Sequence, residues 1–181
     1  SVCSAFSSFV VFFAHDRDGM MSITYWLMGS LAGANWGNIA VILPLVILCV
    51  FFFITQYRVL NLMLLGDEVS ITLGTDLHKY RNFYLLVTSL MIGFIVYASG
   101  MIGFVGLIIP HVVRILVGTD HKKLIPISCL MGAILLVWAD VLCRVMIKGT
   151  ELPIGILISM IGAPCFIYLM AKKSYGFGGK D

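Results

Sequence analysis

Two long stretches without a charged side chain constrain this protein more than any other feature of its sequence. Asp, Glu, Lys and Arg are absent from residues 19–57, a run of 39 residues, and from residues 82–113, a run of 32 residues. A helix needs about 20 apolar residues to cross the hydrocarbon core of a bilayer, which is about 30 Å thick. Each stretch is too long for one crossing, so we expect each to contain a break as well as a membrane helix.

Small and polar residues divide the first stretch. Gly33, Gly37 and Asn38 lie between an amphipathic piece at 23–31 and an apolar run at 39–55. Glycine and asparagine are more typical of turns than of helix interiors. We therefore expect a short helix at 23–31, followed by a membrane span at 39–55.

Glycines divide the second stretch in the same way. A single helix of this length would measure about 48 Å at 1.5 Å per residue, but the segment 100–106 contains three glycines and is followed by Pro110. The pattern predicts a span at 83–99 that turns into a shorter helix ending near Leu116. Two further apolar runs, at 124–146 and 152–171, predict the last spans.

The composition agrees with a lipid environment. Hydrophobic residues make up 60% of the 181 residues and charged residues 12%, whereas a soluble domain carries roughly a quarter of its residues as charged side chains. With a net charge of only +3, the composition excludes a soluble domain, a disordered chain and a nucleic-acid-binding module. We expect an all-α, polytopic membrane protein with about five full transmembrane helices, a partial helix at the N-terminus and short interfacial helices.

Sequence motifs for catalysis and for metal binding are absent. The five cysteines lie in apolar runs without C-x-x-C spacing, which is typical of buried thiols. There is no H-E-x-x-H motif and no G-x-x-x-x-G-K-[ST] phosphate-binding loop. We expect no catalytic residue, no cofactor and no metal site, and any energy from ATP must come from another subunit.

Basic residues predict the orientation, because Lys and Arg collect in short cytoplasmic loops. If the loops at 56–82 and 114–123 and the tail at 172–181 share one side, that side holds nine of the twelve basic residues. The sequence therefore predicts that these loops and the C-terminus are cytoplasmic. The nine are Arg58, Lys79, Arg81, Arg114, Lys122, Lys123, Lys172, Lys173 and Lys180, against Arg17, Arg144 and Lys148 on the other side.

The loop at 56–82 is the longest polar segment and is the first candidate partner surface. Leu65, Val69 and Leu73 have the spacing i, i+4, i+8, which places them on one face of a helix. Two interpretations are equally open on this pattern. The helix either offers an apolar stripe to a partner or lies against its own protein.

Asp140 and Arg144 are a second candidate. They are four residues apart, so on a helix they face each other as an ion pair. A carboxylate in an apolar run either belongs to an ion or proton path or anchors its partner, and we favour the anchor. Arg144, Lys148 and Glu151 would then form a charged outer rim for a protein partner.

Small residues at four-residue spacing form a third candidate. Such spacing favours close helix packing, and the alternative is a smooth wall along a passage for a bulky solute. The positions are Gly29, Gly33 and Gly37 in one segment and Gly155, Ser159 and Ala163 in another.

Several separated motifs resemble the FecCD/BtuC-type permeases, the membrane subunits of type II ABC importers for iron–siderophores, haem and vitamin B12. The resemblance extends over nearly the whole chain. The motifs are YWLMG at 25–29, LGDE at 65–68, GFVGLIIPHVVR at 103–114, GTDH at 118–121, ELPIG at 151–155 and IGAP at 161–164.

The resemblance implies an architecture and a set of partners. Permeases of this family have ten transmembrane helices, pair as two copies, and work with two ATPase subunits and one substrate-binding protein. Residues 1–181 would form a single permease domain, corresponding to the C-terminal half from late in the fifth helix, in the cytoplasmic membrane of a bacterium or archaeon. Lipid would be the surrounding solvent.

The resemblance also implies roles for individual residues. The loop at 56–82 is similar to the coupling segment that docks on the ATPase, Arg144 is similar to the arginine that meets the binding protein, and the last helix borders the passage. The implied coupling residues are Leu65, Gly66, Asp67, Glu68, Val69 and Leu73. The docking residues are Arg144 and Lys148, and the passage residues are Pro153, Gly155, Ser159, Gly162 and Ala163.

Two other functions compete with the importer. One is a secondary transporter driven by an ion gradient, with an unwound binding site at 100–106 and Asp140 as the coupling carboxylate. The other is a structural membrane subunit without a passage. A neighbouring gene for an ATPase with a phosphate-binding loop, together with one for a secreted binding protein, would favour the importer.

Overall fold

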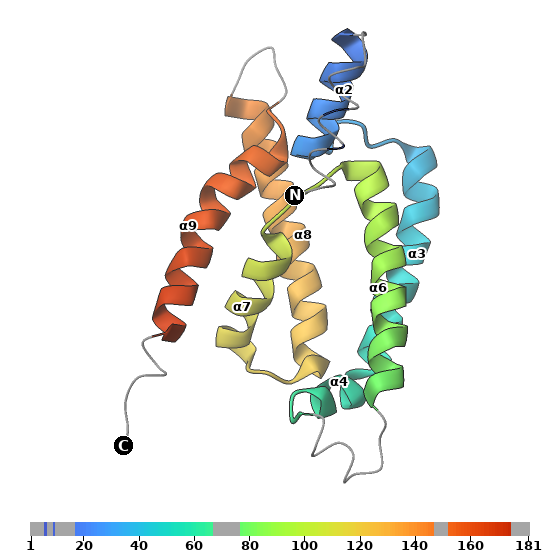
Figure 1. The fold of residues 1–181 in the computed structure, drawn as a ribbon, viewed down its shortest axis with the longest axis vertical. Helices are drawn as coiled ribbons and strands as arrows, with labels where there is room; N and C mark the ends of the chain where they lie inside the picture. The colour runs from blue at the N-terminus through green and yellow to red at the C-terminus, as the bar shows by residue number, and fades with distance from the viewer. Residues whose placement is uncertain (1–5, 7–8, 10–16, 67–76, 147–151, 175–181) are drawn as a thin grey trace.

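The protein is a helical bundle, described by a computed structural model that covers residues 6, 9, 17–66, 77–146 and 152–174 (Figure 1). All regular elements within these residues are helices, as the sequence predicts. They are α2 (Arg17–Met28), α3 (Trp36–Thr55), α4 (Tyr57–Met63), α6 (Leu77–Ser99), α7 (Val105–Val117), α8 (His121–Met146) and α9 (Ile154–Ser174).

Three of the described helices are long and apolar enough to cross a membrane. These are α3 with 20 residues, α6 with 23 and α8 with 26. α7 and the part of α9 at Ile154–Leu169 are shorter apolar helices. The predicted partial helix before α2 falls mostly outside the described residues.

The first stretch contains the predicted break, but the break lies at 29–35 rather than at 33–38, so Gly37 and Asn38 belong to α3. α2 ends at Met28 because Gly29 has a φ of +74°, a left-handed conformation that glycine adopts without strain. α3 begins at Trp36, where the side-chain oxygen of Asn35 accepts a 2.8 Å hydrogen bond from the backbone N–H of Asn38. The short helix begins at Arg17, before the predicted range of 23–31.

The second predicted break is confirmed. α6 ends at Ser99, Gly100 has a φ of +69°, and α7 begins at Val105. Phe104, just before α7, has a φ of +64°, which is unusual for a residue with a bulky side chain. Pro110 lies inside α7 rather than at its end.

The segment at 56–82 differs from the predicted loop at both ends. Its beginning forms α4, a helix of seven residues, and its end belongs to α6, which starts at Leu77. A helix as short as α4 spans about two turns, too few for a hydrophobic period to be recognised in the sequence. Residues 67–76 lie outside the described residues.

The helices form one bundle in which α8 contacts α3, α4, α7 and α9. α7, α8 and α9 pack together, α3 packs with both α6 and α8, and α4 contacts both α6 and α8 at the lower end of Figure 1. One buried cluster joins Ala139 and Cys143 of α8 to Ile154 and Ile158 of α9. A second cluster joins Ile109 and Val113 of α7 to Leu124 of α8.

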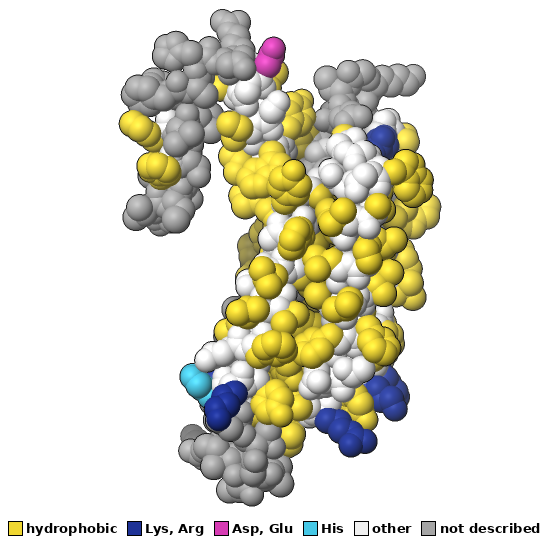
Figure 2. Space-filling model, turned by 90° about the vertical axis from the view of Figure 1, so that its right-hand side faces the viewer, with side chains coloured by type: hydrophobic (Ala, Val, Ile, Leu, Met, Phe, Trp, Pro, Cys, Tyr) yellow, Lys and Arg dark blue, Asp and Glu magenta, His cyan; other side chains and the backbone are white. Residues whose placement is uncertain are grey.

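Most apolar side chains of the long helices point outward. Leu48, Leu130 and Val137 are each more than 60% exposed, an arrangement that requires lipid or another apolar partner around the bundle. Figure 2 shows hydrophobic side chains along the whole height of one face and most of the visible Lys and Arg near its lower end.

Candidate functional site

The helix ends that flank the predicted cytoplasmic loops lie together at one end of the bundle. The C-terminal ends of α7 and α9 and the N-terminal ends of α6 and α8 lie at the same end as α4 (Figure 1). This shared end agrees with the grouping of loops from basic residues. The side of the membrane on which it lies stays a prediction.

A groove opens at this end between α4 and the connection from α7 to α8. Its volume is about 670 Å³, and it contains the predicted coupling residue Leu65. Leu64 and Leu65 are 49% and 58% exposed, so they offer apolar surface beside charged groups. The lining residues are Arg58, Asn61, Leu62, Leu64, Leu65, Thr119 and Asp120.

Only part of the predicted coupling segment belongs to the described residues. Gly66 follows Leu65 with a φ of +89°, a left-handed conformation that suits glycine. The other predicted coupling residues, Asp67, Glu68, Val69 and Leu73, lie outside the described residues. Their docking role stays a prediction.

Asn61 of α4 joins this groove to the start of α8. Its Nδ2 donates a 2.8 Å hydrogen bond to Oδ1 of Asp120. Its Oδ1 accepts a 2.9 Å hydrogen bond from the backbone N–H of His121 and lies 2.7 Å from Nδ1 of the same histidine. One side chain therefore connects segments that are about sixty residues apart in the sequence.

Asp120 accepts hydrogen bonds from both sides of this connection. Its Oδ1 also accepts from the backbone N–H of Lys122 at 3.1 Å, which makes Asp120 the N-terminal cap of α8. The hydrogen bond from Asn61, followed by that from Lys122, holds the pKa of the Asp120 carboxyl below its ordinary value. The carboxylate is thus negatively charged at neutral pH.

Two cations flank Tyr57 at the same end. Nε of Arg58 donates to the Tyr57 hydroxyl at 3.1 Å, which lowers the pKa of that phenol. The charged ends of Arg58 and Lys122 each lie 5.8 Å from the centre of the Tyr57 ring. The exposed end of α4 is therefore positively charged as well as apolar.

The opposite end of the bundle carries the predicted docking arginine. Nε of Arg144 is 2.8 Å from Oδ2 of Asp140, with side-chain exposures of 51% and 25%. The predicted i, i+4 pair is present, and its geometry supports the interpretation that Asp140 anchors Arg144. Lys148 and Glu151 lie outside the described residues.

Close packing explains two of the predicted passage residues. A Cβ on Gly155 would lie 1.9 Å from the carbonyl oxygen of Met28, and one on Gly162 would lie 2.7 Å from Cβ of Phe104. Both glycines are buried. Of these two, only Gly155 belongs to the predicted small-residue pattern, and at this position the close-approach interpretation of the pattern is supported.

The passage role of the five predicted residues stays a prediction. Ser159 and Ala163 are half-buried, so part of the surface of each side chain is exposed. Pro153 lines a hollow of about 360 Å³ between α2 and the start of α9, together with Thr24 and Met28.

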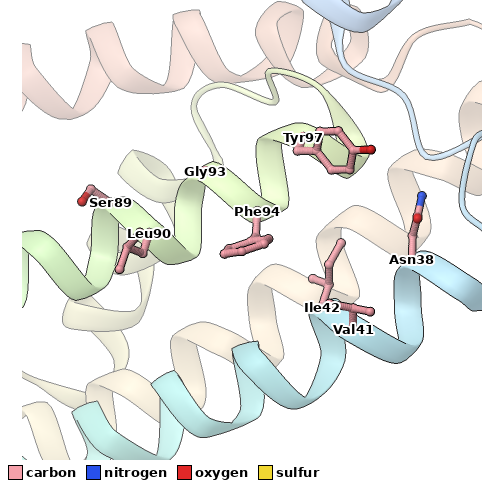
Figure 3. A pocket seen from close by; sticks show the side chains of 8 residues that line it. All are labelled: Asn38, Val41, Ile42, Ser89, Leu90, Gly93, Phe94 and Tyr97. Atoms are coloured by element: carbon pink, nitrogen blue, oxygen red, sulfur yellow. The ribbon is translucent and has the colours of Figure 1, made fainter.

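A further groove lies between α3 and α6 (Figure 3). Its volume is about 540 Å³, and Ile42 and Phe94 point into it from the two helices. Its lining contains none of the predicted coupling, docking or passage residues and no charged side chain. It is lined by Asn38, Val41, Ile42, Ser89, Leu90, Gly93, Phe94 and Tyr97.

Metal ligands do not gather in the described part of the chain. No group of three His, Cys, Asp or Glu side chains there could hold an ion. Cys49 and Cys143 are buried, as the sequence predicts, whereas Cys129 is exposed on the surface of α8.

The contact between Asn61 and Asp120 could not be found from the sequence. Hydrophobic period and residue spacing do not say which two loops meet in space. The available signal was the GTDH motif at 118–121, which belongs to the resemblance but had no assigned role.

Comparison with known proteins shows which family this chain is similar to. Residues 1–172 match the FecCD transport family. The chain is 42% identical over 159 residues to the iron(3+)-hydroxamate import system permease protein FhuG of Bacillus subtilis, covering 88% of this chain and 47% of that protein. It is 37% identical over 177 residues to the vitamin B12 import system permease protein BtuC of Salmonella typhi, covering 96% of this chain and 52% of that protein.

A solved structure has the same fold. It is described as an inward-facing conformation of a transporter assigned to the metal-chelate ABC type. The TM-score is 0.86 with 34% sequence identity, over 93% of this chain and 55% of the other. The chain thus spans about half the length of the relatives that it matches.

Proposed function

Because this chain belongs to the FecCD transport family, we propose that it forms part of the membrane-spanning permease of a binding-protein-dependent ABC importer. The proposed cargo is a metal chelate, namely an iron–siderophore such as a ferric hydroxamate, haem or a cobalamin. The proposed partners are two ATPase subunits, a substrate-binding protein and a second permease copy. The observation that carries this proposal is the shared fold, with a TM-score of 0.86 over 93% of the chain.

The proposed mechanism assigns different partners to the two ends of the bundle. The ATPase contacts the end with α4, where exposed leucines and positive charges lie beside the predicted coupling segment. The binding protein contacts the end with Arg144. ATP binding closes the ATPase subunits, and the helices respond by opening the passage alternately to each side of the membrane.

Arg144 suits the outer role because its guanidinium is exposed and held in place. Asp140 fixes one side of the guanidinium at 2.8 Å, and the side chain keeps 51% of its surface. An acidic group on a binding protein would find a preorganised cation there.

The ion-driven alternative is less well supported by the geometry. A coupling carboxylate has to bind and release a cation during each cycle. Asp140 instead forms an ion pair with Arg144 on the neighbouring turn of α8. The broken segment at 100–104 is joined to α2 by a backbone hydrogen bond from Met101 N–H to the Trp26 carbonyl at 3.2 Å.

Uptake by reconstituted vesicles tests the proposed function. The full-length permease, its ATPase and its binding protein are assembled in proteoliposomes and offered a ferric hydroxamate, haem or cobalamin in separate arms. We expect accumulation of one of the three that requires ATP and persists when ionophores dissipate ion gradients. A catalytically inactive ATPase serves as the control.

The contrary result is equally clear. Uptake driven by an ion gradient without nucleotide would replace the importer by a secondary transporter. Absence of uptake in every arm, with the ATPase bound and active, would remove the proposed cargo class.

A further inference from the structure

We propose that Asn61 is a positioning residue that locks the coupling end of α4 to the start of α8, so that α4 and α8 move as one unit during transport. This inference rests on the proposed function, because it needs an ATPase that pushes on the coupling segment. It gives a role to the GTDH motif at 118–121, which neither the coupling nor the docking assignment uses.

The first support is the location of Asn61. It lies one turn before Leu65 and Gly66, which lead into the predicted coupling segment, and it lines the same groove as Leu65. A force applied to that segment acts on α4, which precedes it in the chain. Asn61 is the α4 side chain with three contacts to the α7–α8 connection among the described hydrogen bonds.

The second support is the chemistry of the contact. An amide offers a donor and an acceptor at the same tip. Nδ2 faces the carboxylate of Asp120, and Oδ1 faces the backbone N–H and Nδ1 of His121. An aspartate would place two carboxylates together, and a leucine of similar size would make none of the three contacts.

The third support is the path beyond Asp120. The backbone carbonyl of Asp120 accepts from Leu124 N–H at 2.9 Å, which joins the capping residue to the first turn of α8. Leu124 is buried against Ile109 and Val113 of α7. When α4 moves, Asn61 therefore transmits the movement to α7 and α8, which are packed against each other.

α8 extends this path across the molecule. Its 26 residues measure about 39 Å at 1.5 Å per residue. The locked end carries Asp120 and His121, and the opposite end carries the Asp140–Arg144 pair. One helix therefore connects the proposed ATPase end with the proposed binding-protein end, and Asn61 forms hydrogen bonds with its capping residue and its first residue.

The test separates transport from assembly. Asn61→Leu and Asn61→Asp are introduced into the full-length permease in the complete complex, and the vesicles are offered whichever of ferric hydroxamate, haem or cobalamin the unmutated complex accumulates. We expect both variants to lower uptake per ATP hydrolysed by about fivefold or more, a factor within the usual range of coupling between sites. The ATPase should co-purify as before and keep hydrolysing ATP, because its docking residues are unchanged.

Ser89→Leu is the matched control. Ser89 lies on α6 outside the segment at 56–82, and its Oγ donates a 2.9 Å hydrogen bond to the Leu86 carbonyl, a contact that stays within α6. We expect uptake per ATP to be unchanged in this variant. Unaltered uptake per ATP in both Asn61 variants would overturn this inference and leave the proposed function standing. Loss of ATPase binding would also overturn it, because Asn61 would then be a docking residue. Failure of the unmutated complex to use ATP for uptake would overturn the proposed function and this inference with it.

Discussion

At the residue scale, glycines allow the helices to meet closely at the end of the bundle that carries Arg144. The backbones of α2, of the break after α6 and of the start of α9 meet there. Gly100 lies so close to the Trp26 carbonyl oxygen that a Cβ would be 2.1 Å from it, and Gly155 is equally close to Met28. Side chains at these positions would separate the segments.

Substitution of Gly155 measures how much this approach contributes. Gly155→Ala places a methyl group against the Met28 carbonyl, and overpacking of this kind costs about 1–3 kcal/mol. We expect a lower unfolding temperature of the full-length protein in detergent. Gly132→Ala is the control, because a Cβ on Gly132 has no heavy atom within 4 Å among the described neighbours. Equal unfolding temperatures for the two variants would contradict the close packing.

Arg144 supports a second prediction at this scale. Arg144→Glu removes the exposed cation and places a carboxylate one turn from Asp140. We expect the affinity of the complex for its binding protein to fall by roughly tenfold at low salt, and the loss to shrink as ionic strength rises. Binding of the labelled binding protein to the complex in nanodiscs measures it.

Arg81→Glu is the matched charge reversal for this experiment. Arg81 lies on the first turns of α6, at the end with α4. Its reversal should leave binding-protein affinity unchanged. If Arg144→Glu also leaves that affinity unchanged, the outer docking role is removed.

At the scale of elements, the sequence predicted the long helices and their breaks well. The reason is that a bilayer fixes the length of an apolar span and excludes unpaired backbone groups, so a long apolar stretch has to break at its glycines. Gly29 and Gly100 both adopt the left-handed conformation that ends a helix. α7 follows the second break with the predicted shorter length.

The element that the sequence did not predict is α4. Its seven residues, Tyr57–Met63, are too few to show a period, and the polar surroundings favoured a loop. The Asn61–Asp120 contact was also beyond prediction, because it depends on how α4 lies across α8. The Asp140–Arg144 pair was predictable, because both residues belong to one helix and the i, i+4 spacing alone places them together.

At the scale of the whole molecule, the two ends of the bundle have different chemistry. One end combines α4, exposed leucines and basic side chains, and the other carries the Asp140–Arg144 pair beside the closely packed glycines. Between them, outward-pointing apolar side chains cover α3, α6 and α8. We expect these two ends to face opposite sides of a membrane and to contact different partners.

Thiol labelling tests this expectation most directly. In the full-length protein with its native cysteines replaced, single cysteines are introduced at Thr119, beside the α4 groove, and at Met146, the last residue of α8. A membrane-impermeant maleimide is then applied to right-side-out and to inside-out vesicles. We expect Met146→Cys to be labelled in right-side-out vesicles and Thr119→Cys in inside-out vesicles. Labelling of both positions from the same side, or with the two sides exchanged, would contradict it.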